Sequence, residues 1–181
     1  EAVWLAFQAP RWHPLAVKVG VGRVNALTGG PWDERLHAGP QDYLVCPPQL
    51  WLDGVILAEG MVRQFVAVPL GLGASVEAQL RGSERFGGIQ VLVFDARPGR
   101  FAEQAPPAPA PPAGGPMAMP PQNAAAPQAM GLGIGGRMRQ KVYADPYGLE
   151  TWQTRPSGKV QVYLLDSLSY QQVTGEPPPP S

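Results

Sequence analysis

The sequence is poor in the residues that build disulfides and metal sites. Its 181 residues include one cysteine, Cys46, and two histidines, His13 and His37. A single cysteine excludes an intrachain disulfide and fits a reducing compartment such as the cytoplasm, although some secreted proteins also lack disulfides. Three nitrogen or sulfur ligands cannot complete a tetrahedral zinc site, and no Asp-x-Asp-x-Asp calcium loop is present. We therefore predict no metal and no cofactor.

Charge is also scarce, and neither sign is in excess. Lys and Arg number 14, Asp and Glu number 14, and charged residues make up only 15% of the chain. Binding of nucleic acid needs a clustered excess of cations, so we predict no nucleic-acid partner. Residues 104–136 carry no charge and outnumber the roughly 20 residues that cross a bilayer. Their nine prolines are incompatible with a helix in lipid, so we predict no membrane span.

Glycine and proline, by contrast, are abundant, with 22 and 23 residues. Both interrupt helices, and a long helical periodicity is almost absent. Alternation with a period of two recurs instead. Val17, Val19 and Val21 share one face of a predicted strand, while Lys18, Gly20 and Gly22 share the other. The break in phase at Val24 predicts a bulge or a twist near Gly22.

Two further segments show the same alternation. Residues 89–94 are apolar on both faces, which is typical of a central strand. Residues 74–83 are predicted to form a strand with Val76, Ala78 and Leu80 pointing inward and Glu77 pointing to solvent. A helical turn is predicted at residues 33–37, and residues 168–175 could form a short closing helix or a further strand.

The predicted fold is all-β: a two-sheet antiparallel sandwich or a flattened barrel of about eight strands. One domain spans residues 1–175 and is interrupted by a long, low-complexity loop rich in Pro, Ala and Gly at residues 104–136. Residues 176–181 read as the start of a proline-rich linker. The chain begins with Glu rather than Met, so we interpret it as a mature form or as a segment of a longer protein.

The glycines Gly131, Gly133 and Gly136 match a dinucleotide-binding fingerprint. Such a site needs a buried strand before the glycines and a helix after them. Here a Pro/Ala tract precedes them, and an alternating, strand-like segment follows. We therefore interpret these glycines as a hinge.

Five tryptophans are many for this length. Trp32 and Trp152 lie near turns or strand ends beside polar residues, where they could bind a protein partner or stack on sugar rings. Trp51 lies in an apolar setting, which favours a buried position. Arg137, Arg139 and Lys141 alternate along one predicted edge strand. They could form an anion-binding strip, but cations at a sheet edge more often prevent aggregation.

A hydrolase is an alternative that the sequence leaves open. Cys46 with His37 and Asp42 could act as nucleophile, base and orienting residue. The more ordinary interpretation makes Cys46 a buried apolar residue that ends a strand before two prolines. Paired carboxylates are a second route, and the sequence offers scattered candidates: Asp53, Glu59, Glu77 and Asp95.

Four segments together resemble a known kind of module: "PQDYLVCPPQLWLDG", "VRQFVAVPLG", "GGIQVLVF" and "GGRMRQKVYADPYG". They are similar to an uncharacterised β-rich module of bacterial and fungal multidomain proteins, which in some of them lies near a ubiquitin-like domain. The likeness covers residues 17–175, with the Pro/Ala tract as a variable insertion. It implies an accessory or scaffolding role and no catalytic residues.

These observations favour a non-enzymatic binding or structural module. We expect it to contact a protein partner, or a second copy of itself, through exposed strand edges and through Trp32, Trp152, Arg137, Arg139 and Lys141. A carbohydrate-binding sandwich and a hydrolase are the alternatives.

Overall fold

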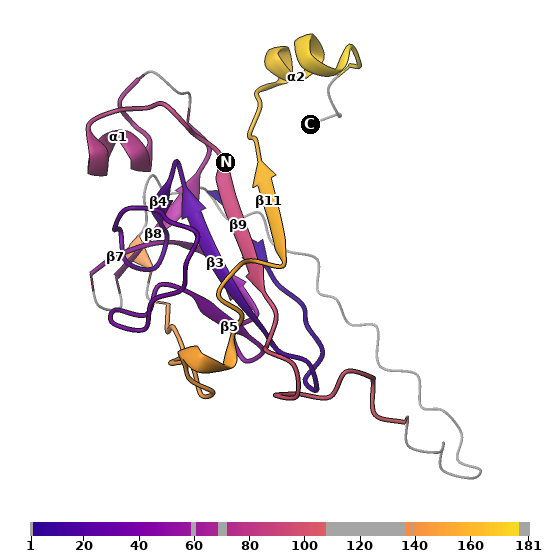
Figure 1. Ribbon diagram of the computed structural model, residues 1–181. Helices are drawn as coiled ribbons and strands as arrows, with labels where there is room; N and C mark the ends of the chain where they lie inside the picture. The colour runs from indigo at the N-terminus through magenta and orange to yellow at the C-terminus, as the bar shows by residue number, and fades with distance from the viewer. Residues whose placement is uncertain (1, 59–60, 69–71, 108–136, 139, 178–181) are drawn as a thin grey trace, which may run out of the picture.

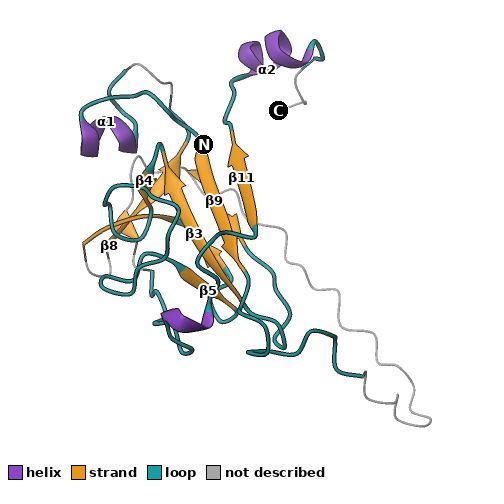
Figure 2. Ribbon diagram, viewed as in Figure 1, coloured by secondary structure: helices purple, strands orange, loops and turns teal. Residues whose placement is uncertain are grey.

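The protein is mostly β, with antiparallel sheets, in a computed structural model that describes residues 2–58, 61–68, 72–107, 137–138 and 140–177 (Figures 1 and 2). The strands are β1 (Ala2–Val3), β2 (Leu5–Ala6), β3 (Leu15–Val21), β4 (Val24–Asn25), β5 (Leu44–Cys46), β6 (Trp51–Leu52), β7 (Gly54–Ala58), β8 (Met61–Val66), β9 (Ile89–Phe94), β10 (Arg137–Met138) and β11 (Gly158–Val162).

The largest sheet has five strands in the order β11-β9-β3-β4, with β5 also paired to β3. Residues 16–21 of β3 pair with residues 89–94 of β9. Val17 and Val19 face one side of this sheet, called here the inner face, and Lys18 faces the other, outer side. The predicted alternation is confirmed, and β9 is a central strand between β3 and β11.

A second, four-stranded sheet lies against the inner face. It has the order β1-β8-β10, with β7 paired to β8, and the two-stranded sheet of β2 and β6 adjoins it. Val19 and Leu44 of the large sheet share one apolar cluster with Leu52, Val55 and Phe65 of the smaller sheets. Burial of these side chains between the sheets stabilises the fold, at roughly 25 cal/mol for each Å² of apolar surface removed from water.

A second apolar cluster covers the outer face. Tyr43, Val45, Phe94 and Trp152 are buried there, and Trp32 is half-buried against them. Irregular segments rather than strands supply this cover, because Trp32 and Trp152 both lie outside the named strands. The sheet is therefore packed on both faces, which explains why its central strands are apolar on both sides.

The break in phase at Val24 marks a hairpin, so the predicted bulge or twist near Gly22 is wrong. β3 turns back into β4 through Gly22 and Arg23, and Val21 pairs with Val24. Both turn residues have positive φ, 56° and 60°, which is the geometry of a two-residue type I′ turn. Glycine adopts this conformation without strain, and the alternation restarts in the opposite direction after it.

The fold also contains short helices, so the prediction that it is all-β is wrong. Residues 74–83 form not a strand but the helix α1 (Val76–Arg81), which begins after the N-cap Ser75 and ends at Gly82 with φ 69°. Its Glu77 is buried, against the prediction that this side chain faces solvent. The two termini explain the difference, because a capping serine and a left-handed glycine delimit a helix that alternation alone could not reveal.

Two other short helices lie near the C-terminal end. Helix α2 spans Ser167–Thr174, so of the two structures predicted for this segment, a helix or a strand, the helix is confirmed. The other, η1 (Leu149–Thr151), is a single 3₁₀ turn. The helical turn predicted at residues 33–37 is wrong, because those residues form bends held by side-chain hydrogen bonds. α2 lies apart from the sheets, beyond the end of β11 (Figure 1), and none of its residues is buried.

The flattened barrel is not formed, because β11 and β10 each pair with a single neighbour among the described strands. Most of the predicted Pro/Ala/Gly-rich loop, residues 108–136, lies outside the described residues, as do the glycines Gly131, Gly133 and Gly136. No helix within the described part of the chain is long and apolar enough to cross a membrane.

Candidate functional site

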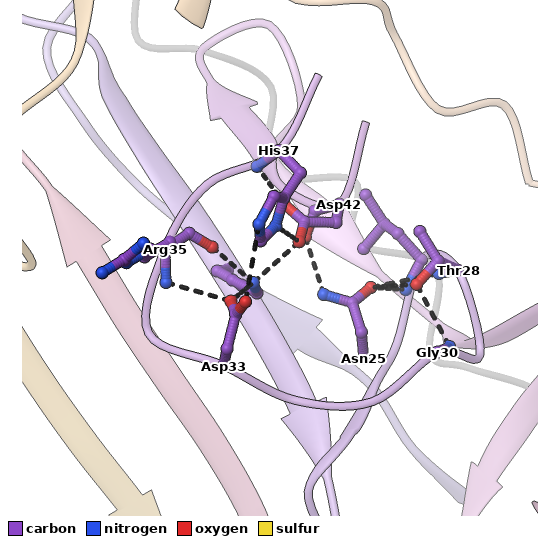
Figure 3. Close-up of polar contacts among 9 residues, drawn as sticks. Asn25, Thr28, Gly30, Asp33, Arg35, His37 and Asp42 are labelled. Carbon is purple, nitrogen blue, oxygen red and sulfur yellow. Dashed lines mark hydrogen bonds and ion pairs between the residues drawn. The ribbon is translucent and has the colours of Figure 1, made fainter. Parts of the chain in front are cut away.

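The outer face of the large sheet carries a buried charge, Lys18. It lies among polar groups of the loop after β4, of which Asp33, Arg35 and Asp42 are labelled in Figure 3. Its Nζ lies 2.7 Å from Asp33 Oδ1 and 2.7 Å from Asp42 Oδ2, and it also donates to the backbone carbonyl of Arg35. These three acceptors satisfy the three donors of the ammonium group. The residue is fully buried at 0% exposure, so the ion pairs replace the hydration that burial removes.

The loop from Pro31 to Asp42 is folded around this ammonium group. Asp42 accepts hydrogen bonds from the backbone N–H of His37, at 2.8 Å, and contacts His37 Nδ1 at 2.8 Å. The backbone carbonyl of Asp42 accepts from Asn25 Nδ2 at 2.8 Å. At the other end of the loop, Pro31 forms an isolated β-bridge with Val24. Both ends are thus tied to the hairpin, and Lys18 holds the residues between them.

The carboxyl group of Asp33 has a pKa below its usual range. Partial burial raises this pKa, but the hydrogen bonds from Lys18 and from the backbone N–H of Arg35 lower it, as do the charges of Lys18 and His37. The net effect keeps Asp33 ionised through the neutral range, where it balances the lysine.

Trp32 covers the same lysine. The Lys18 Nζ lies 5.4 Å from the centroid of the Trp32 ring, within the range of a cation–π contact. The ring also packs on Gly20, where an added Cβ would lie 2.6 Å from Trp32 Cε3. Any larger residue at position 20 would push this ring away. Trp32 therefore helps to seal the outer face and is only partly available to a partner.

Asp33, His37 and Asp42 are residues that can ligate a metal. Their ligand atoms all lie within 4.8 Å of one another, and no other group of three such residues does so in the described part of the chain. However, the ammonium group of Lys18 contacts both carboxylates and already supplies the positive charge that a metal ion would bring. The donor set therefore fits a buried lysine better than a metal ion.

Trp152 is held on the outer face by a second polar group, Asp145. The Trp152 indole N–H donates to Asp145 Oδ2 at 2.8 Å, and the Tyr43 hydroxyl donates to the same oxygen at 2.6 Å. Burial raises the pKa of Tyr43, and the hydrogen bond to Asp145 raises it further, so the phenol stays protonated. This network holds residues 145–152, which include η1, beside Tyr43, which directly precedes β5.

The outer edge of β11 is a second feature of the surface. Among the described strands β11 pairs only with β9, so the backbone N–H and C=O groups of its other edge have no strand partner there. From β11 to the end of α2 the chain exposes six large apolar side chains, each at 47–74% exposure: Val160, Tyr163, Leu164, Leu165, Leu168 and Val173.

The predicted partner-binding residues are divided between different parts of the molecule. Trp32 and Trp152 belong to the same cluster on the outer face, but Trp152 is only 1% exposed, so its ring has no free face for stacking. Arg137 lies on β10, which pairs only with β8 among the described strands, but Lys141 lies outside the named strands, so the two do not share one edge strand as was predicted. Lys141 follows β10 in the chain, and its Nζ lies 5.2 Å from the Tyr143 ring centroid. Arg139 lies outside the described residues.

The residues of the proposed nucleophilic site do not meet. Cys46 is buried in the cluster on the inner face, while His37 contacts Asp42 on the outer face. Burial raises the pKa of the Cys46 thiol, although a backbone hydrogen bond from Ala9 opposes this, so the reactive thiolate is disfavoured. Asp33 and Asp42, which were not among the four candidates, come together on the outer face, and Glu59 lies outside the described residues.

Sequence reasoning missed Lys18 because a lysine in an alternating strand normally faces solvent. The available signal was its isolation: it is the one charged residue of β3, and the following loop carries several acidic residues. Trp51 was also misjudged, since it is 47% exposed instead of buried.

Comparison with known proteins does not assign the chain to a family. No family model, no curated protein and no solved structure matches the chain. The resemblance to a β-rich module of multidomain proteins therefore stays a prediction.

Proposed function

We propose that the protein is a non-enzymatic binding module that associates with a second copy of itself through the outer edge of β11. Support comes from one observation: this edge has no partner among the described strands, and exposed apolar residues follow it directly. In this proposal the two sheets form a sandwich, which leaves the edge of the larger sheet available.

Addition of a strand at such an edge supplies backbone hydrogen bonds, and side-chain contacts then determine the partner. A bare edge with exposed apolar residues is otherwise a site of uncontrolled aggregation, so a specific partner there has a physical reason.

A second copy fits because the sequence of β11 is complementary to itself. In an antiparallel pair centred on Val160, the two Val160 side chains lie opposite each other. Lys159 of one copy then lies opposite Gln161 of the other, so no two like charges face each other across the pair. The resulting contact is isologous and closes as a dimer with two-fold symmetry.

A lysine at Val160 tests this proposal. Val160 is 54% exposed, so Val160→Lys should leave the fold intact but place two ammonium groups opposite each other. We expect the wild-type chain to reach twice its mass of 19.3 kDa in a concentration series by sedimentation. The variant should require at least about tenfold higher concentration for the same association, equivalent to about 1.4 kcal/mol.

Val66→Lys provides the matched control, because Val66 is 45% exposed on β8, in the other sheet. It should associate like the wild type. A wild-type mass of 19.3 kDa at every concentration would contradict self-association, and so would an equal loss in both variants.

Carbohydrate binding is a second candidate, now supported by Trp4 and Trp51 instead of Trp32 and Trp152. Trp4 is 68% exposed and Trp51 is 47% exposed. Trp51 pairs with Ala6, and Trp4 precedes Ala6 by two residues with the same outward exposure. The two rings thus lie on one surface of the β2–β6 pair, where sugar rings could stack.

This candidate is tested by tryptophan fluorescence with soluble glycans. Binding should shift the emission of the wild type, and Trp51→Ala should remove the shift. Absence of any saturable shift would reject the carbohydrate candidate without affecting the proposal for β11.

A further inference from the structure

The outer face contains a cavity of about 580 Å³ whose wall is unusually rich in arginine. Arg35 comes from the loop that surrounds Lys18, Arg97 follows β9, and Arg155 precedes β11. Leu36, Leu149 and Trp152 supply apolar parts of the same wall. A cavity of this size suits a small organic ligand.

The three arginines have no ion-pair partner among the described residues. The acidic residues beside Arg35 are already paired, since Asp33 contacts Lys18 and Glu34 contacts Lys159. Asp95, the acidic residue nearest to Arg97 in sequence, contacts His13. Glu150 is the only carboxylate in the cavity wall. Three guanidinium groups against one carboxylate leave an excess of two positive charges at this cavity.

Arg97 is held in place before any ligand arrives. Its Nε donates to the backbone carbonyl of Trp152 at 3.0 Å, and its backbone N–H donates to Thr151 at 2.8 Å. Its terminal nitrogens donate to no residue in the part of the chain that the structure describes, which leaves them for a ligand. Such preorganisation reduces the entropy lost on binding.

Arg155 and its neighbour Thr154 add further donors. Both line the cavity, together with two adjoining hollows of the surface. Neither of their backbone N–H groups donates to another residue that the structure describes. The backbone of Arg35 is tied to Lys18 and Asp33, and its side chain extends away from that cluster (Figure 3).

We propose that this cavity binds an organic oxyanion: a phosphate or carboxylate group on an aromatic or apolar body. The guanidinium groups would bind the anionic oxygens, since their planar donor geometry matches both phosphate and carboxylate. Leu36 and Leu149, which are more exposed than Trp152, would contact the body of the ligand. This site is separate from the proposed contact at β11.

Calorimetric titration with four probes tests the site. Phenyl phosphate carries both the anion and the apolar body, inorganic phosphate lacks the body, and benzyl alcohol lacks the charge. We expect phenyl phosphate to bind saturably, inorganic phosphate to bind about tenfold more weakly, and benzyl alcohol not to bind. Benzoate, the fourth probe, distinguishes the two oxyanions: tighter binding of benzoate assigns a carboxylate ligand, and weaker binding assigns a phosphate.

Arg155→Gln and Arg97→Gln should each weaken phenyl phosphate binding at least about tenfold, because each removes a charged hydrogen-bond donor. Arg11→Gln is the control, since Arg11 is exposed and lies outside this cavity wall. Thermal unfolding of all three variants separates loss of binding from loss of the fold. The proposal is wrong if neither phenyl phosphate nor benzoate saturates the wild type, or if Arg11→Gln weakens binding as much as Arg155→Gln.

Discussion

A lysine in the middle of a valine-rich strand is an unusual choice of residue, because burial of a charge without partners costs many kcal/mol. Lys18 has partners from one loop only: the carboxylates of Asp33 and Asp42 and the carbonyl of Arg35. The same loop places Trp32 over the strand and Arg35 in the arginine-lined cavity. One residue of β3 therefore determines the shape of much of the outer face.

Lys18→Met should destabilise the protein by about 3 kcal/mol, because it leaves the buried carboxylate of Asp42 without its counter-ion. The free energy of unfolding at neutral pH, measured with denaturant, checks this value. We also expect weaker binding of phenyl phosphate at the cavity, since the loop that carries Arg35 would no longer be held.

Lys159→Met is the comparison for that experiment. Lys159 forms an exposed ion pair with Glu34, with both side chains more than half exposed. Exposed pairs contribute at most about 1 kcal/mol. An equal loss of stability in the two variants would show that burial of the Lys18 pair has no special role.

At the scale of elements, the short helix α1 is held to the sheet by its own buried carboxylate. Glu77 accepts hydrogen bonds from the backbone N–H groups of Arg85, Phe86 and Gly87, which precede β9. Burial raises the pKa of Glu77, but these hydrogen bonds and the charge of Arg81 together lower it below its usual value. α1 and the start of β9 are thus joined through one side chain.

Glu77→Gln should lower stability at neutral pH by about 1–3 kcal/mol, because an amide accepts these hydrogen bonds less strongly than a carboxylate. The pKa of Glu77 is lower in the folded protein than in the unfolded chain. Its contribution is therefore fully present above the unfolded pKa of about 4.3 and is lost as the pH falls through the folded value.

Unfolding curves for wild type and Glu77→Gln across the acid range measure this effect. The difference between the two proteins should be constant near neutrality and shrink below about pH 4. Glu103→Gln, at an exposed loop position, should show almost no difference from the wild type. A stability gap for Glu77→Gln that does not change with pH would contradict the role given to the carboxylate.

At the scale of the whole molecule, the large sheet has an apolar cluster on each face, but the segments that cover the two faces differ in structure. A second sheet covers the inner face, and irregular segments cover the outer face. Those segments are fixed by side-chain hydrogen bonds, such as the bond from Gln41 Nε2 to the backbone carbonyl of Tyr143. Loops held in this way can carry binding groups, which is why both the arginine-lined cavity and the Lys18 cluster lie on this side.

The two proposed surfaces can be tested separately because they depend on different groups. The β11 contact uses a backbone edge and exposed apolar side chains, whereas the cavity uses guanidinium groups. Val160→Lys therefore tests association, and Arg155→Gln tests anion binding, each without removing the residues of the other.

The sequence by itself determined the β-rich class and which residues of β3 and β9 share a face, because alternation of apolar residues is a local property of an extended chain. It did not reveal α1, since six residues between a serine and a glycine are too few for a helical period to appear. The sequence also did not show which tryptophans are buried: Trp51 is exposed and Trp152 is buried, contrary to the prediction for each.

Only the tertiary structure decided which charges are buried and which are left without a partner. Lys18 meets Asp33 and Asp42, and Arg97 meets Trp152, across separations of 15 to 55 residues. Such contacts depend on how loops cross a sheet, and no local pattern of residue types encodes that path. The candidate sites of this protein consist of these long-range contacts, so they appear only once the chain is folded.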